Sequence, residues 1–147
     1  KSESPIASSI ASSASQYSNP NFSGEVEFDY DNHNGRYMIG SGSMQFELAF
    51  SGASNGSIHI LNDPANIEGI ALAHDAKSFS EIKDASKFDY TSRLRTPHTG
   101  EIVTLVNQNG FFAAIKLGEI KARSHGAKRS SVSFKYVINQ EKETSFV

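Results

Sequence analysis

The stretch from Gly100 to Lys121 constrains the fold of this chain more than any other part of the sequence. Two apolar runs flank the dipeptide Asn109-Gly110, which readily takes the positive φ values of a tight hairpin turn. The sequence therefore predicts a β-hairpin over residues 100–121.

Apolar residues occur on both faces of this hairpin. One face would be continuously apolar, with Phe111, Ala113, Ile115 and Leu117. The other face would be only half polar, with Phe112, Ala114, Lys116 and Ile120. A strand pair that is apolar on both faces is central or covered. We expect the cover to be either the N-terminal segment with Ile6 and Ile10 or the segment with Phe79 and Ile82.

The same alternation of apolar and polar residues recurs along the chain from Gly24 onward. It predicts strands that contain Val26, Phe28 and Tyr30; Tyr37 and Ile39; Met44, Phe46, Leu48 and Phe50; Ile58 and Ile60; Ile70 and Leu72; and Val132, Phe134, Tyr136 and Ile138. About eight or nine short strands at this spacing are typical of an antiparallel β-sandwich. We expect a jelly-roll-like sandwich, with a half-open β-barrel as the alternative.

Two segments depart from this pattern. Residues 1–21 are rich in Ser, which favours a linker, although Ile6, Ile10, Ala14 and Tyr17 would share one face of a connecting helix. Residues 76–87 contain Ser78 and Glu81 in capping-box spacing, which predicts one short helix. We therefore divide the chain into this linker or helix, a sandwich domain over 22–140 and a polar tail over 141–147.

Composition limits the function classes. The chain has 147 residues, a net charge of −2 and no cysteine, so disulfides and thiolate chemistry are excluded. The lack of cysteine favours a reducing, cytoplasmic compartment, with an extracellular setting as the alternative. No apolar run is long enough to cross a membrane, and the start at Lys1 suggests a piece of a longer protein.

The sequence contains no catalytic or metal-binding motif that we can identify. The five histidines form no close ligand pair. Asp29, Asp31 and Asn34 before Gly35 have the composition of a calcium loop but lack its spacing, and a turn is the favoured interpretation. We expect no enzyme activity, no metal and no cofactor.

Basic residues of the C-terminal half give the first candidate binding site, a patch for phosphate or an acidic protein. Its members are Arg93, Arg95, Arg123, His125, Lys128 and Arg129. Solvated surface charge is the alternative interpretation. Arg36, Tyr37 and His59 form a second candidate face.

Several short motifs resemble a β-rich accessory domain of bacterial multidomain proteins, some of which carry a TIR domain. They are Asn34-Gly35-Arg36-Tyr37, Ile39-Gly40-Ser41-Gly42, Phe46, Ser57-Ile58-His59, Phe88-Asp89-Tyr90-Thr91-Ser92-Arg93 with Arg95, Gly100-Glu101-Ile102-Val103, and Asn107 with Asn109-Gly110-Phe111-Phe112-Ala113. The resemblance covers residues 24–139. It implies a partner domain upstream and a cytoplasmic, defence-related setting, and it implies no catalytic role.

These observations lead to one leading hypothesis, a non-catalytic recognition or assembly module that binds a protein partner or a neighbouring domain of the same chain. A secreted carbohydrate-binding module is an alternative, although the chain has no Trp to stack on a sugar. A nucleic-acid or nucleotide sensor that uses the basic patch is the other alternative. We expect no membrane partner.

Overall fold

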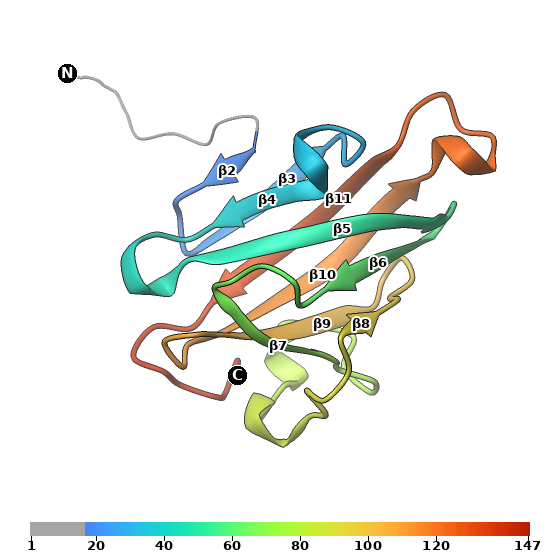
Figure 1. Ribbon diagram of the computed structural model, residues 1–147. Coiled ribbons are helices and arrows are strands. Elements are labelled where there is room, and N and C mark those ends of the chain that lie inside the picture. Colours follow the sequence, from blue (N-terminus) through green and yellow to red (C-terminus); the bar gives the residue numbers. More distant parts are fainter. Residues whose placement is uncertain (1–16) are drawn as a thin grey trace.

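Two five-stranded β-sheets make up the part of the chain that the computed structural model describes, residues 17–147 (Figure 1). The β10 sheet has the strand order β3-β11-β10-β9-β7, and the β5 sheet has the order β2-β4-β5-β6-β8. The strands are β2 (Ser18–Asn19), β3 (Ser23–Phe28), β4 (Arg36–Ile39), β5 (Phe46–Ser54), β6 (Ser57–Leu61), β7 (Ile67–Leu72), β8 (Leu94–Arg95), β9 (Ile102–Asn107), β10 (Phe112–Lys121) and β11 (Ser131–Ile138).

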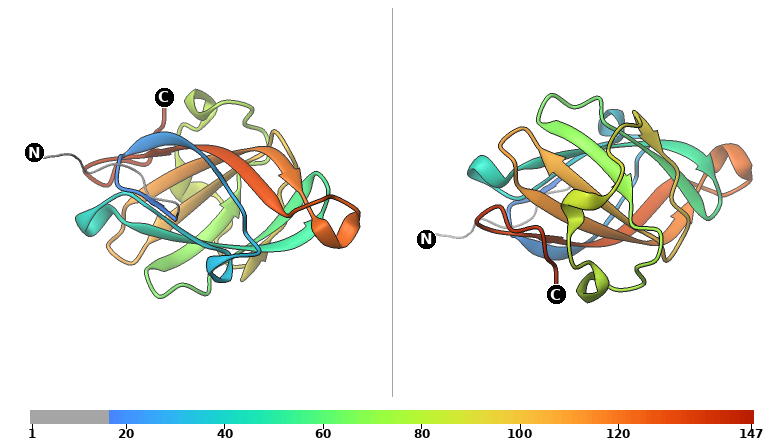
Figure 2. Two further views of the ribbon diagram at one scale, coloured as in Figure 1. Left: turned by 90° about the horizontal axis from the view of Figure 1, so that it is seen from above. Right: turned by 90° about the horizontal axis from the view of Figure 1, so that it is seen from below.

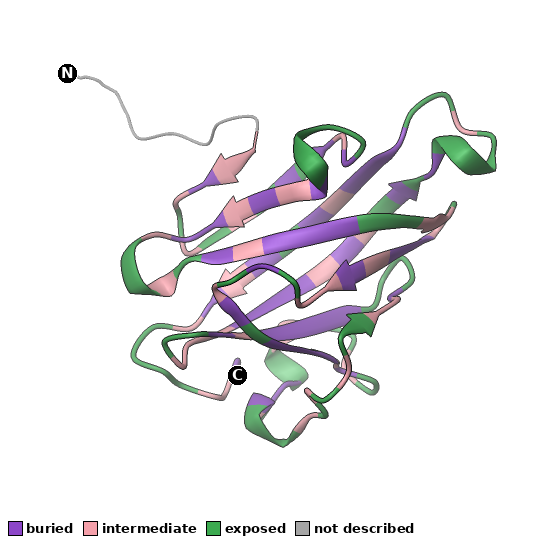
Figure 3. Ribbon diagram, viewed as in Figure 1, coloured by how far each residue is buried: buried purple, intermediate pink, exposed green. Residues whose placement is uncertain are grey.

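The two sheets pack face to face around one apolar core, so the predicted β-sandwich is confirmed (Figure 3). The inward positions of the alternating strands fill this core. Four of its aromatic rings touch one another: Phe28, Tyr37, Phe50 and Phe134 have centroid separations of 5.1 to 5.9 Å. Every strand pair is antiparallel except β2 with β4.

Meanders of consecutive strands form the middle of each sheet: β9-β10-β11 in one and β4-β5-β6 in the other. The strand order is therefore that of two meanders with added edge strands rather than the paired Greek keys of a jelly roll. The two-residue strands β2 and β8 were not predicted, because they are too short to show an alternation.

The predicted hairpin over 100–121 is present as β9 and β10, but its turn is longer than expected. Gly110 has a φ of +86°, whereas Asn109 is not among the residues with positive φ. The N–H of Gly110 donates to the carbonyl of Asn107 at 3.0 Å, and the N–H of Asn107 donates to the carbonyl of Phe111 at 3.0 Å. This is the geometry of a three-residue loop that ends in one left-handed glycine.

A β-bulge alters the expected faces of β10. The pairing register with β11 shifts between Leu117 and Ile120. Ile120 therefore joins Leu117 in the core between the sheets, and its expected place on the opposite face with Phe112 was wrong. The extra residue of a bulge reverses the alternation beyond it, which the sequence pattern alone does not reveal.

The outer face of the β10 sheet is covered by a second apolar cluster from the same chain. Ile82, Ala85 and Phe146 pack there against Ile102 and Ala114. The cover expected from the Phe79 and Ile82 segment is thus confirmed, and the C-terminal tail adds Phe146. The alternative cover with Ile6 and Ile10 lies outside the described residues.

The covering segment is not the single helix expected over 76–87. It forms two 3₁₀ turns, η3 (Phe79–Glu81) and η4 (Ala85–Lys87). The Asp84 side chain accepts a hydrogen bond from the N–H of Ser86 and starts a new turn, because short polar side chains compete for backbone groups and favour caps over helix interiors.

Tyr90 fastens the end of this segment to the sheet. Its hydroxyl donates to the Ala85 carbonyl at 2.7 Å and lies 2.9 Å from the hydroxyl of Thr104, which is fully buried. Burial raises the pKa of Tyr90 to about 12, so the phenol stays neutral and available as a donor at physiological pH.

The expected linker or helix over residues 1–21 lies largely outside the described residues. Its described end contains β2, which pairs with β4 in parallel. The N–H of Gly40 donates to the Asn19 carbonyl at 2.9 Å, so the chain enters the domain as an edge strand. The start of the described chain and the C-terminus both lie on the outside of the sandwich (Figure 2).

Candidate functional site

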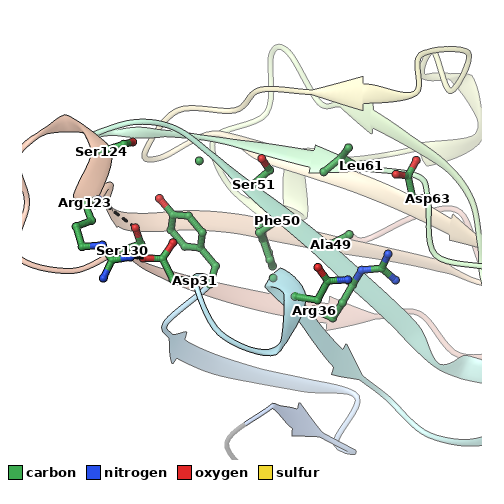
Figure 4. Close-up of a pocket in the computed structure, with 14 residues that line it drawn as sticks. Asp31, Arg36, Ala49, Phe50, Ser51, Leu61, Asp63, Arg123, Ser124 and Ser130 are labelled. Atoms are coloured by element: carbon green, nitrogen blue, oxygen red, sulfur yellow. Dashed lines mark hydrogen bonds and ion pairs between the residues drawn. The ribbon is translucent and has the colours of Figure 1, made fainter.

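A groove of about 810 Å³ lies on the outer face of the β5 sheet. Figure 4 shows its lining side chains. The outward residues Ala49 and Ser51 of β5 form its floor, together with Gly52. The loop before β4 and the end of β6 form its two sides, and the loop after β10 closes one end.

The groove forms because β5 carries small outward side chains, whereas the neighbouring strands β4 and β6 carry larger ones. The register places Arg36 of β4 and Leu61 of β6 on either side of Ala49. Side chains directly opposite on neighbouring strands stand side by side on the same face. The exposed Ser51 and Gly52 follow along β5, so the hollow continues toward the loop after β10.

The loop before β4 has an unusual backbone. His33, Asn34 and Gly35 have φ values of 52°, 56° and 69°, which places three successive residues in the left-handed region. A Cβ at Gly35 would lie 2.2 Å from the carbonyl oxygen of Phe50, so the loop needs glycine to sit this close to β5. Left-handed non-glycine residues store strain, which clusters at functional sites.

A second hollow of about 560 Å³ lies on the other side of this loop. Asn34 and Arg36 line both hollows, and Tyr17 and His33 line only the second. The rings of Tyr17 and His33 are stacked at a centroid distance of 4.3 Å. The left-handed loop is thus the ridge between two adjoining depressions.

Charges of opposite sign are paired at both ends of the groove. At the end by the β10–β11 loop, an Arg123 nitrogen lies 3.3 Å from a carboxylate oxygen of Asp31. Near the other end, Arg36 donates to Glu47 at 2.5 Å, beside the groove. The lining itself holds two aspartates and two arginines, Asp31, Asp63, Arg36 and Arg123, so its formal charge is balanced.

Asp63 is held in its charged form. Arg93 Nε donates to its carboxylate at 3.0 Å. This hydrogen bond, assisted by the positive charges of Arg93 and Arg36, lowers the pKa of Asp63. A carboxylate with a lowered pKa is suited to pairing with a cation rather than to accepting and releasing protons near neutral pH.

The six residues of the expected basic patch do not form one cluster. Arg93 and Arg95 lie at β8, whereas Arg123, His125, Lys128 and Arg129 lie on the loop between β10 and β11, which contains η5 (Arg123–His125) (Figure 1). Of the six, Arg123 lines the groove.

The four arginines of the patch each face a carboxylate. Arg93 pairs with Asp63 at 3.0 Å, Arg95 with Asp89 at 3.6 Å, Arg123 with Asp31 at 3.3 Å and Arg129 with Glu27 at 3.9 Å. Asp89 lies only six residues before Arg95. The partners of Arg93, Arg123 and Arg129 come from distant parts of the sequence, so the spacing of the basic residues gave no sign of these three.

The structure places two of the three members of the second expected face on the outside of the β5 sheet. Arg36 and His59 both point outward from the β5 sheet, and His59 Nδ1 lies 2.8 Å from the hydroxyl of Thr96. Tyr37 was placed wrongly: it is 3% exposed and points into the core, because neighbouring residues of a strand face opposite sides.

Sequence reasoning missed Ser51, Ser124 and Ser130 as lining residues, and took Asp31 only as part of a turn. The turn is present, since Asp29 Oδ1 accepts from the N–H of Asp31 at 2.9 Å. The small outward residues of β5 were a usable sequence signal for a groove, because small side chains on the outer face of a strand leave space between the larger side chains of its neighbours.

Within residues 17–147, no group of three or more His, Asp or Glu side chains is placed to hold a metal ion. The same part of the chain contains no helix that is both long and apolar enough for a membrane span. Comparison with protein-family models, with curated proteins and with solved structures found no match for this chain.

Proposed function

We propose that this protein is a non-catalytic recognition module of a larger bacterial protein, and that the groove over β5 binds an extended peptide segment of a protein partner or a neighbouring domain. The observation that carries the proposal is the groove itself: an open hollow with a floor of small side chains and balanced charges. The bacterial, defence-related and cytoplasmic setting rests on the resemblance described above.

The charge balance favours a peptide over a nucleic acid. Nucleic-acid binding depends on cations that replace the counterions of the phosphates. Arg36 and Arg123 are already in contact with Glu47 and Asp31. A phosphate chain would have to displace these carboxylates, whereas a peptide with mixed charges can extend both pairs into small networks.

The lining also favours a peptide over a glycan. Sugar sites commonly offer an exposed aromatic face for stacking. The aromatic residues that line this groove are Tyr30 and Phe50, and each is only 5% exposed. The remaining lining offers hydroxyls, charged groups and short apolar side chains, which suit a polypeptide.

The proposal is tested by filling the groove. A library of random peptides displayed on phage is selected on the wild-type protein, and the selected peptides are then measured against Ser51→Trp. Ser51 is exposed on the floor, and Trp is favourable in a strand, so the fold should be kept. We expect affinity to fall at least about tenfold, which corresponds to about 1.4 kcal/mol.

The matched control is Ser80→Trp, the same substitution at an exposed position in η3, on the layer that covers the other sheet. It should leave the affinity of the same peptides unchanged. Selected peptides that bind Ser51→Trp as well as wild type would contradict the proposal. A second outcome would also contradict it. In that outcome no peptide binds, whereas a glycan or an oligonucleotide binds the wild-type protein and loses this binding in Ser51→Trp.

A further inference from the structure

Among residues 17–147, strand β3 forms a long outer edge of the β10 sheet. It has six residues and pairs on one side with β11. The outer strands of the β5 sheet, β2 and β8, have two residues each. The opposite outer strand of the β10 sheet is β7, where Tyr90 packs on the face at Gly69, with a Cβ at Gly69 falling 2.9 Å from Tyr90 Cβ. An open edge is a template for a further strand.

The hydrogen-bond pattern shows which backbone groups face outward from β3. The N–H of Ile138 donates to the carbonyl of Phe22 at 2.7 Å. In an antiparallel pair, residues alternate between bonding to the neighbour and facing away. The backbone groups of Ser23, Glu25 and Glu27 therefore face away from β11, and none of them has a hydrogen-bond partner within residues 17–147.

The side chains on this edge are acidic. Glu25 and Glu27 are exposed on the outer face of the sheet, opposite the covered core positions Val26 and Phe28. Lys135 stands opposite Glu25 on β11, and Arg129 lies 3.9 Å from Glu27. A strand added at the free edge would place its own side chains beside the same two carboxylates.

We propose that the outer edge of β3 accepts an extended peptide with Lys or Arg at alternate positions, which joins the β10 sheet as a sixth strand. Backbone hydrogen bonds to Ser23, Glu25 and Glu27 would give the affinity, and the two glutamates would select basic side chains. A second copy of β3 is a poor occupant, because antiparallel self-pairing would bring glutamates together across the interface. This inference does not depend on the groove over β5.

The test uses a labelled synthetic peptide that alternates Lys with Val and measures its binding to the full chain by fluorescence anisotropy. Glu25→Pro removes an outward N–H without removing a bond to β11, and prolines are tolerated at such positions of edge strands. Glu25→Ala also removes the carboxylate but keeps the N–H. We expect Glu25→Pro to bind about tenfold more weakly than Glu25→Ala.

A second measurement leaves the protein unchanged, so that it holds even if Glu25→Pro fails to fold. The same peptide, N-methylated at alternate residues on its bonding side, keeps its charge but should lose binding to the wild-type chain. The double variant Glu25→Lys and Glu27→Lys should bind the peptide less well than Glu68→Lys, which alters an exposed glutamate of β7.

Four results would overturn the inference. They are no binding of the basic peptide by wild type, equal binding of an acidic peptide that alternates Glu with Val, binding unaffected by N-methylation, and a dimer of the protein that Glu25→Pro dissociates.

Discussion

The buried side chain of Asn107 connects the β10 sheet to the loop that leads into the β5 sheet. It is 1% exposed. Its Oδ1 accepts from the N–H groups of Asn109 and Phe111, both at 3.0 Å. Its Nδ2 donates to the carbonyls of Ser43 and Gln45 at 2.9 and 3.1 Å. One amide thus shapes the β9–β10 turn and fastens it to the loop before β5.

Replacement of Asn107 by Ala should be strongly destabilising, because it leaves buried backbone donors and acceptors without partners. We expect a loss of about 2–4 kcal/mol in the free energy of unfolding, measured by urea denaturation. Asn109→Ala is the control, since its exposed Nδ2 makes one bond, to the Ser43 carbonyl. Similar losses in the two variants would contradict the role given to Asn107.

At the residue scale, the sequence predicted the β9–β10 turn but not the hydrogen bonds by which Asn107 joins this turn to the loop before β5. Asn109-Gly110 identifies a turn because local backbone preferences decide it. The acceptors of Asn107 lie more than sixty residues earlier in the chain, in the loop that leads into β5 of the other sheet. Tyr37 was placed wrongly for a different reason. The alternation groups it with the inward Ile39, but the candidate face joined it to Arg36, the neighbouring residue, which points to the opposite side.

The element that best links sequence to architecture is the β9–β10 hairpin. Its apolar residues on both faces predicted a cover, and the turns η3 and η4 provide one with the C-terminal tail. The tail is polar by composition, yet the N–H of Phe146 donates to the Ile82 carbonyl at 2.9 Å. The tail is therefore part of the outer layer.

Phe146→Ala should lower the free energy of unfolding by about 2–3 kcal/mol. This is somewhat less than the loss expected for truncation of a fully enclosed Phe, because the Phe146 side chain lies at the margin of the cluster. Val147→Ala is the matched control: Val147 is 79% exposed and its truncation should change stability by less than about 0.5 kcal/mol. Thermal and urea unfolding both measure the difference. If Phe146→Ala behaves like Val147→Ala, the tail does not stabilise the outer layer.

At the scale of the whole molecule, the two outer faces of the sandwich differ. The outer face of the β10 sheet is packed under the protein's own turns and tail, whereas that of the β5 sheet carries the groove. The alternating strands were enough to predict the sandwich and the covered hairpin. The full lining of the groove could not be predicted, because Asp31, Ser51 and Arg123 come together only through the pairing of distant strands.

The most direct test of the binding role is to locate the contact site of a groove-selected peptide on the protein itself. Amide chemical shifts of the isotope-labelled full chain are recorded while a peptide from the phage selection is added. The account predicts that the largest changes fall on residues that line the groove, Ser51, Gly52, Arg36, Asp63 and Arg123 among them. Changes confined to the covered face around Phe79, Ile82 and Phe146, with the groove unaffected, would contradict it.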